Sequence, residues 1–156
     1  MLEYYGPDRI QTIKKAENYQ DLLAIAMDVL DEMSNDQVSK PIYQVCGPIS
    51  TGGTGSRNKN LIIFSKVIKK LTEDGWSIFN QMPFESTMLR IFTSRPELGG
   101  ATLLEEFYKP IFRSGYISGF FFIHSWEGSN GCNWENKQAK VLGIPRLYLA
   151  QSYMLD

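Results

Sequence analysis

Apolar residues recur at helical spacing near the start of the chain. One face of the predicted helix carries Leu22, Ile25, Ala26, Val29, Leu30 and Met33. Acidic residues fill the opposite face, and the run Ser34-Asn35-Asp36 ends the pattern. We therefore predict a helical extension over residues 1–40. Its acidic face is interpreted as a solvated surface, with docking of a partner as the alternative.

After Pro41 the pattern changes to short apolar runs that alternate with helical periods. Strands are predicted at residues 42–46, 76–79, 117–123 and 146–150, and helices around residues 61–71, 102–113 and 133–142. Pro110 is expected to kink the second of these helices or to start a new one. The stretch from Asn80 to Gly100 holds no sustained period and is expected to be irregular, with a helical turn near Met88.

This alternation of strands and helices is typical of a parallel sheet with right-handed crossovers. The predicted fold is α/β: a three-layer, flavodoxin/Rossmann-like parallel sheet of about four to five strands, with an N-terminal helical extension. The extension covers residues 1–40 and the α/β domain residues 41–156. Ligands of such sheets bind beyond the carboxyl ends of the strands.

A Gly-rich loop, residues 47–56, follows the first predicted strand. Such a loop before a helix can aim backbone N–H groups at an anion, and Ser50 and Arg57 add a hydroxyl and a positive charge. The loop matches neither a Walker loop nor a dinucleotide fingerprint, because Gly53-Thr54 replaces Lys-Ser/Thr and the third Gly is missing. Anion binding and a plain surface turn both remain open from these residues.

A second loop, residues 126–134, follows the third predicted strand and leads to Glu135. We expect Glu135 in the first turn of the next helix, where the helix dipole favours an ionised carboxylate. An ionised carboxylate beside a sugar can attack the anomeric carbon. The alternative is that Glu135 merely stabilises the start of the helix, as glutamates often do.

Composition narrows the classes of partner. Sixteen basic and seventeen acidic side chains give a net charge of −1, which argues against a nucleic-acid polymer or an anionic membrane as partner. Cys46, Cys132 and His124 fit no metal motif, and no cofactor is expected. The first residues lack the basic start and apolar stretch of a secretory signal, so a cytoplasmic location is expected.

The segment from Pro41 to Ala150 resembles the nucleoside 2-deoxyribosyltransferases, and more closely their relatives that hydrolyse 2′-deoxynucleoside 5′-monophosphates. Two stretches carry the resemblance: residues 42–53, and Ser129-Asn130-Gly131-Cys132-Asn133-Trp134-Glu135 followed by Ala139 and Gly143-Ile144-Pro145. It implies that Glu135 is the nucleophile that attacks C1′ of a (deoxy)ribose, and that Tyr43 orients Glu135 or contacts the sugar. The implied substrate-binding residues are Gly47, Ser50, Gly52, Gly53, Arg57, Trp126, Ser129 and Gly131.

The resemblance also implies a 5′-phosphorylated small-molecule substrate, because Ser129 stands where the transferases acting on free nucleosides carry Asp. It implies a homodimer or a higher homo-oligomer. Two positions depart from the catalytic families: Pro110 and Ser118 stand where those families carry Asp. Two functions therefore remain open: an enzyme that cleaves N-glycosidic bonds, and a non-catalytic sensor of a nucleotide or sugar phosphate.

Overall fold

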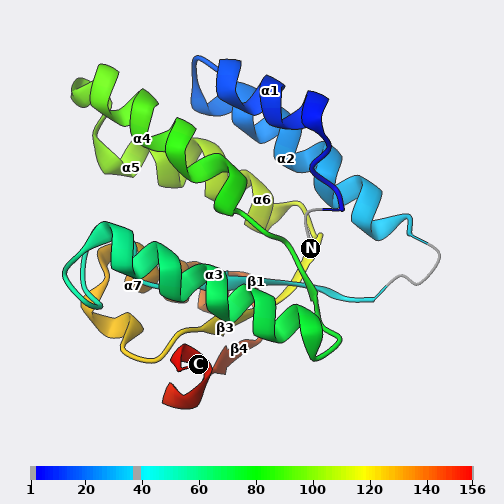
Figure 1. Ribbon diagram of the computed structural model, residues 1–156, viewed down its shortest axis with the longest axis vertical. Coiled ribbons are helices and arrows are strands. Elements are labelled where there is room, and N and C mark those ends of the chain that lie inside the picture. The colour runs from blue at the N-terminus through cyan, green and yellow to red at the C-terminus, as the bar shows by residue number, and fades with distance from the viewer. Residues whose placement is uncertain (1–2, 37–39, 156) are drawn as a thin grey trace. The chain divides into compact units, whose positions relative to one another are not determined.

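The computed structural model describes residues 3–36 and 40–155, and these form two compact units (Figure 1). One unit contains residues 40–79 and 117–155 and holds the sheet. The other contains residues 3–36 and 80–116 and is helical. The sheet unit begins at Lys40, one residue before the predicted start of the α/β domain at residue 41. Residues 80–116, in contrast, group with the N-terminal helices rather than with the sheet.

The sheet has four parallel strands within the described residues: β1 (Ile42–Cys46), β2 (Ser77–Ile78), β3 (Ile117–Phe122) and β4 (Arg146–Tyr148). Their order is β2-β1-β3-β4. The predicted α/β fold class, with a Rossmann-like parallel sheet and an N-terminal helical extension, is confirmed. The central strands β1 and β3 form because their residues are almost all buried and apolar, as in sheets covered on both faces.

Two helices of this unit connect neighbouring strands. Helix α3 (Arg57–Glu73) joins β1 to β2, and α7 (Asn130–Leu142) joins β3 to β4 (Figure 1). The two connections leave the centre of the sheet in opposite directions, so right-handed crossovers place these helices on opposite faces. The carboxyl ends of β1 and β3 therefore lie at the switch in strand order, where open sheets bind ligands.

Side chains of β1 alternate between the two faces of the sheet. Tyr43 lies against Trp76 and Phe121, with ring centroids 5.1 and 5.2 Å away. Gln44 and Cys46 point to the opposite face, because successive side chains of a strand alternate. On the α3 side, a Cβ added to Gly47 would lie 2.5 Å from Ile123 Cδ1 and 3.2 Å from Phe64 Cδ2. Gly47 thus permits close packing of the strand end against α3.

The helical unit begins with α1 (Pro7–Lys15) and α2 (Tyr19–Ser34) and continues with α4 (Glu85–Ser94), α5 (Gly99–Leu103) and α6 (Lys109–Arg113). Short 3₁₀ turns precede α4 and α5, and a π-helical stretch, Leu104–Tyr108, precedes α6. The apolar stripe predicted for residues 22–33 is buried along α2. Pro110 lies in the first turn of α6, directly after the π-helical stretch, where its missing N–H is tolerated.

The prediction for residues 80–100 was wrong in one respect, because they include the ten-residue helix α4. Phe84, Met88 and Ile91 are buried at helical spacing. Pro83 lies in the 3₁₀ turn that leads into the helix, and Arg95 leaves helical conformation just before Pro96. The two prolines thus flank the helix and do not interrupt it.

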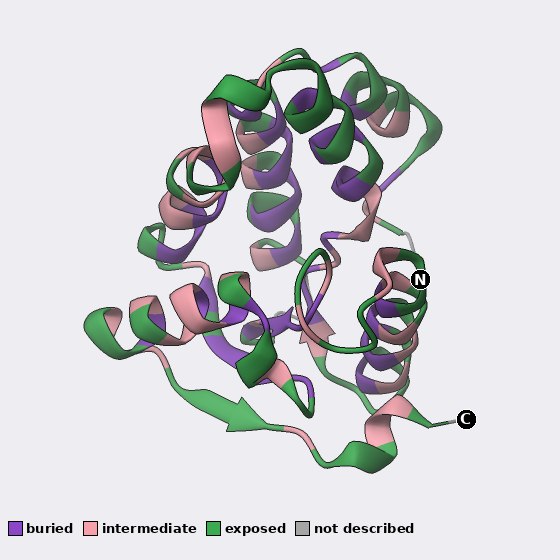
Figure 2. Cartoon of the chain, turned by 90° about the vertical axis from the view of Figure 1, so that its left-hand side faces the viewer, coloured by how far each residue is buried: buried purple, intermediate pink, exposed green. Residues whose placement is uncertain are grey.

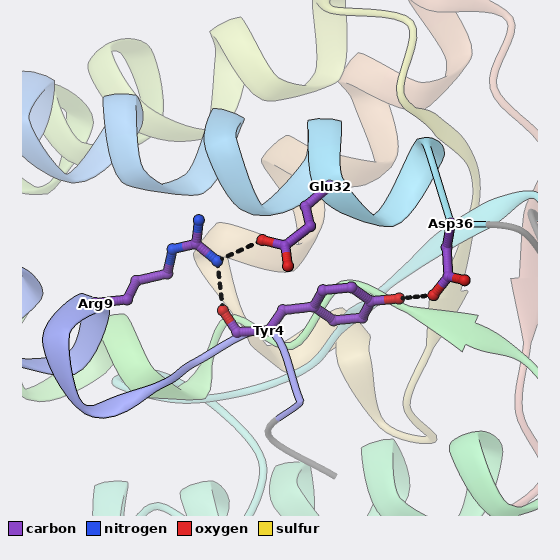
Figure 3. A network of polar contacts seen from close by, with 4 residues as sticks. All are labelled: Tyr4, Arg9, Glu32 and Asp36. Carbon is purple, nitrogen blue, oxygen red and sulfur yellow. Dashed lines mark hydrogen bonds and ion pairs between the residues drawn. The ribbon is translucent and has the colours of Figure 1, made fainter.

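The N-terminal residues are tied to the end of α2 by a small polar network (Figure 3). Arg9 donates to Glu32 Oε2 at 2.8 Å and to the Tyr4 carbonyl at 2.6 Å, while the Tyr4 hydroxyl donates to Asp36 Oδ2 at 2.7 Å. Partial burial and the Asp36 carboxylate raise the pKa of Tyr4 to about 12. The acidic face predicted for this helix therefore makes contacts within its own unit.

The edge strand β4 is exposed along its length (Figure 2). Leu147 and Tyr148 are both exposed there, although successive strand residues point to opposite faces. Within residues 3–36 and 40–155, no helix combines the length and the apolar character that crossing a membrane requires.

Candidate functional site

The Gly-rich loop and the loop after β3 meet at the carboxyl edge of the sheet. The Thr51 hydroxyl accepts a hydrogen bond from the Asn130 N–H, the first N–H of α7, at 2.9 Å. Gly52 has a φ of 71°, and a Cβ built on it would lie 2.4 Å from the Gly128 carbonyl carbon. Only a glycine accommodates both the backbone conformation and this close approach. The two segments that the sequence analysis singled out are thus one contiguous structure.

Asn60, in the first turn of α3, holds the Gly-rich loop in shape. Its Oδ1 accepts hydrogen bonds from the Thr54 N–H at 3.0 Å and from the Thr54 hydroxyl at 2.8 Å. Its Nδ2 donates to the carbonyls of Ile49 at 2.9 Å and Gly52 at 3.3 Å. Asn60 is only 4% exposed. Asn60 was not among the predicted site residues, although a polar residue on the apolar face that it shares with Phe64 and Val67 was a signal.

Helix α7 begins earlier than predicted. Ser129 is its N-cap, and the Ser129 hydroxyl accepts a hydrogen bond from the Cys132 N–H at 3.2 Å. The helix starts at Asn130 rather than at Asn133, so Glu135 lies in the second turn and the first turn holds no acidic residue. The expectation that the helix dipole acts on Glu135 as a first-turn residue is therefore wrong. The capping serine starts the helix three residues upstream.

Glu135 is a buried carboxylate, with 7% of its surface exposed. Two buried thiols lie beside it: Cys46 at the end of β1 and Cys132 on the first turn of α7. Burial raises the pKa of Cys46 well above its ordinary value, and the adjacent Glu135, which accepts a hydrogen bond from the thiol, raises it further. Burial and Glu135 also raise the pKa of Cys132. Both sulfurs therefore stay protonated next to the carboxylate.

The predicted binding residues of the two loops differ in their packing and exposure. Gly53, with a φ of 61°, lies so close to Asn60 that an added Cβ would be 2.6 Å from Oδ1. Ser50 is exposed, and Arg57 is a half-buried residue at the start of α3. A Cβ on Gly131 would meet its nearest neighbour, the Ser129 hydroxyl, at 3.9 Å. An alanine at position 131 would therefore fit without a clash.

The two predicted aromatic residues lie in separate clusters. Trp126 stacks on Tyr148 and contacts Phe122, with ring centroids 5.7 and 5.2 Å away. Phe122 pairs with Cys46 across the sheet, so this cluster borders the face on which Glu135 lies. Tyr43 lies three residues before Cys46 and points to the opposite face. The structure does not bring Tyr43 to Glu135, and strand alternation is the reason.

A small pocket of about 140 Å³ lies on the α3 side of the Gly-rich loop. It is lined by Pro48, Gly53, Thr54, Asn60, Ile63, Ile123, His124, Ser125 and Met154. Ser125 has a φ of 71°, the only positive φ of a non-glycine residue in the described parts of the chain. Its hydroxyl lies 3.1 Å from His124 Nδ1. Across residues 3–36 and 40–155, no His, Cys, Asp and Glu side chains gather into a group that could hold a metal ion.

The fold and the site define an α/β protein with a loop-built pocket at the switch point of a parallel sheet. Comparisons with protein-family models, with curated proteins and with solved structures found no match.

Proposed function

We propose that the sheet unit binds a nucleoside or nucleotide and cleaves its N-glycosidic bond, with Glu135 as the nucleophile. The observation that carries the proposal is the position of Glu135: a carboxylate only 7% exposed, next to the carboxyl end of β1. Buried carboxylates are rare, and they cluster at functional sites. This one lies beside a Gly-rich loop that is fixed to the start of its own helix.

In the proposed reaction a carboxylate oxygen of Glu135 attacks C1′ of the sugar. The C1′–N bond breaks, its electron pair passes to the base nitrogen, and the departing base takes up a proton from water. The resulting glycosyl ester is then attacked at C1′ by water or by the nitrogen of a second base. That step returns the carboxylate and completes hydrolysis or transfer.

The Gly-rich loop supports a phosphorylated substrate. Arg57 and Lys59 at the start of α3 supply positive charge, and Gly52, Gly53 and Gly55 turn the backbone with positive φ. Backbone N–H groups in such turns and at helix starts bind phosphate oxygens. The Ser129 hydroxyl accepts from the Cys132 N–H and retains its own proton. It can therefore donate a hydrogen bond to an anionic oxygen.

The test is base release from nucleosides and nucleoside 5′-monophosphates, ribo and deoxy, by wild type, Glu135→Gln and Glu127→Gln. Glu127 is an exposed carboxylate of the neighbouring 3₁₀ turn, so its variant is the matched control. We expect Glu135→Gln to lower the rate on the order of a thousandfold or more, while Glu127→Gln keeps wild-type activity. Equal rates in all three proteins would exclude Glu135 as the nucleophile.

A second candidate is a nucleotide or sugar-phosphate sensor without turnover. It is favoured by Pro110 and by the exposed Ser118, which occupy positions where the resembling enzymes carry Asp. Neither side chain can protonate a leaving base. This candidate predicts nucleotide binding by calorimetry, weakened in Arg57→Ala, and no base release from any compound. Turnover by wild type that Glu135→Gln abolishes would exclude it.

A further inference from the structure

Gln44 is a polar residue in the middle of the buried strand β1. Its exposed fraction is 0%, and within the described parts of the chain neither its Oε1 nor its Nε2 has a hydrogen-bond partner. Buried polar groups are nearly always hydrogen-bonded, because an unpaired one has lost its water without replacement. A carboxamide with both ends unpaired is therefore a feature that folding alone does not explain.

The position of Gln44 relates it to Glu135. Gln44 and Cys46 lie two residues apart on the same face of β1, roughly 7 Å along the strand. Glu135 is buried on α7, the helix on the same face of the sheet as Cys46. The order from the carboxyl edge inward is thus Cys46 with Glu135 first and the Gln44 carboxamide behind them. The Gln44 carboxamide and the Glu135 side chain thus lie on the same face of the sheet, about two strand residues apart along β1.

The chemistry of a carboxamide indicates what that group is. The oxygen accepts and the adjacent NH₂ donates, in one plane. The edge of a nucleobase presents a matching donor and acceptor side by side, and glutamine pairs with such an edge through two hydrogen bonds. A phosphate or a sugar hydroxyl does not offer this planar donor–acceptor pair. Phenylalanines opposite Gln44 and Cys46 in the register, Phe120 and Phe122, add flat apolar surface on the same face.

We propose that Gln44 is a specificity-determining residue, whose carboxamide pairs with the hydrogen-bonding edge of the base in the substrate. The inference rests on the N-glycosidic function proposed above and adds the group that selects the base. It explains why an unpaired amide is retained inside a parallel strand: its partner belongs to the ligand. Binding energy then depends on the base edge, while the attack at C1′ depends on Glu135.

The test compares wild type with Gln44→Met, which keeps the length of the side chain and removes both hydrogen-bonding groups. The measured quantity is kcat/KM for base release from four 2′-deoxynucleoside 5′-monophosphates, those of adenine, guanine, cytosine and thymine. We expect Gln44→Met to lose about fivefold to 150-fold on the preferred base and to rank the four bases nearly equally. Its Tm should rise, because the unpaired amide is gone from the free protein. Gln138→Met, the same replacement on the half-buried part of α7, should keep the wild-type ranking.

The outcomes separate this inference from the proposed function. A raised Tm with an unchanged ranking would overturn the role of Gln44, while loss of base release in Glu135→Gln would still uphold the reaction. If wild type releases no base, the reaction fails, and the Kd values of the same four compounds decide about Gln44. A flattened ranking of those values in Gln44→Met supports base recognition. An unchanged ranking, or no binding of any of the four by wild type, overturns it.

A second readout requires no variant of the protein. Wild type is compared on its preferred substrate and on an analogue whose base lacks the exocyclic amino or keto group. Loss of about fivefold or more in kcat/KM, or in affinity where turnover is absent, is expected if Gln44 pairs with that edge. Equal values for the two compounds would overturn the inference even if Gln44→Met fails to fold.

Discussion

Asn60 accepts two hydrogen bonds from one residue of the Gly-rich loop, the Thr54 N–H at 3.0 Å and the Thr54 hydroxyl at 2.8 Å. The same carboxamide donates to the carbonyls of Ile49 and Gly52 on the other side of the loop. A single buried side chain of α3 thus fixes both ends of the loop turn. The shape of the loop depends on the helix that follows it.

We therefore expect Asn60→Leu to destabilise the protein by about 2–3 kcal/mol, because it leaves buried loop groups unpaired. It should also expose residues 47–56 to limited proteolysis. Asn58→Leu, at an exposed position of the same helix, is the control and should change the free energy of unfolding by less than about 0.5 kcal/mol. Denaturant titrations measure both. Equal effects of the two replacements would contradict the role assigned to Asn60.

Gly52 and Gly55 allow backbone strain to be separated from steric clash. Both have positive φ, but an added Cβ meets the Gly128 carbonyl carbon at 2.4 Å at Gly52 and nothing within 4 Å at Gly55. Gly55→Ala should cost about 1–2 kcal/mol, from its left-handed backbone alone. Gly52→Ala should cost roughly 3 kcal/mol or more, since the two loops must also move apart. If thermal denaturation gives equal losses, the contact between Gly52 and Gly128 is not needed for stability.

The sheet could be predicted closely because its central strands are short and mostly apolar. Ile42 to Cys46 matches β1, and β3 ends one residue before the predicted Ile123. Helix α4 was missed because Pro83 and Pro96 suggested an irregular segment, whereas they flank the helix. The grouping of residues 80–116 with the N-terminal helices depends on tertiary packing. No local pattern encodes it.

The candidate site was only partly predictable. Glycines and hydroxyl residues at strand ends indicated the two loops, and a hydrogen bond from the Asn130 N–H to the Thr51 hydroxyl joins them. The cap at Ser129 moved Glu135 from the first turn of α7 to the second. Tyr43 and Gln44 are neighbours in sequence, yet strand alternation sends only Gln44 to the face of Cys46. Deciding which of the two faces the site required the structure.

Because two thiols are buried, we predict that the free energy of unfolding falls at alkaline pH. Burial and Glu135 raise the pKa values of Cys46 and Cys132 in the folded protein. Thiols of the unfolded chain ionise with a pKa of about 8.5. Their stabilising effect is thus fully present below about pH 8.5 and is lost as pH rises further, since only the unfolded chain releases the protons.

The free energy of unfolding should fall by up to about 1.4 kcal/mol per pH unit for each thiol between roughly pH 8.5 and 9.5. Urea titrations under reducing conditions measure this slope. Cys132→Ala should reduce it and leave the slope at neutral pH unchanged. Rapid labelling of both cysteines in the folded protein at pH 8 would contradict the burial and protonation described here.

The hydroxyls of Thr51 and Ser129 both accept hydrogen bonds from N–H groups in the first turn of α7. We therefore predict that replacements of the two residues have coupled effects on the free energy of unfolding. Ser129→Ala removes the N-cap of α7 and should cost about 1 kcal/mol. Thr51→Val removes the acceptor for the Asn130 N–H and should cost about 0.5–1.5 kcal/mol. Once the cap is absent, the first turn of α7 loosens, and the Asn130 N–H is no longer held against the Thr51 hydroxyl.

The double variant should therefore lose less stability than the sum of the two single losses, by at least about 0.5 kcal/mol in a denaturant-based double-mutant cycle. Strict additivity would mean that the Gly-rich loop and the start of α7 are held independently, and the single site described here would then be two.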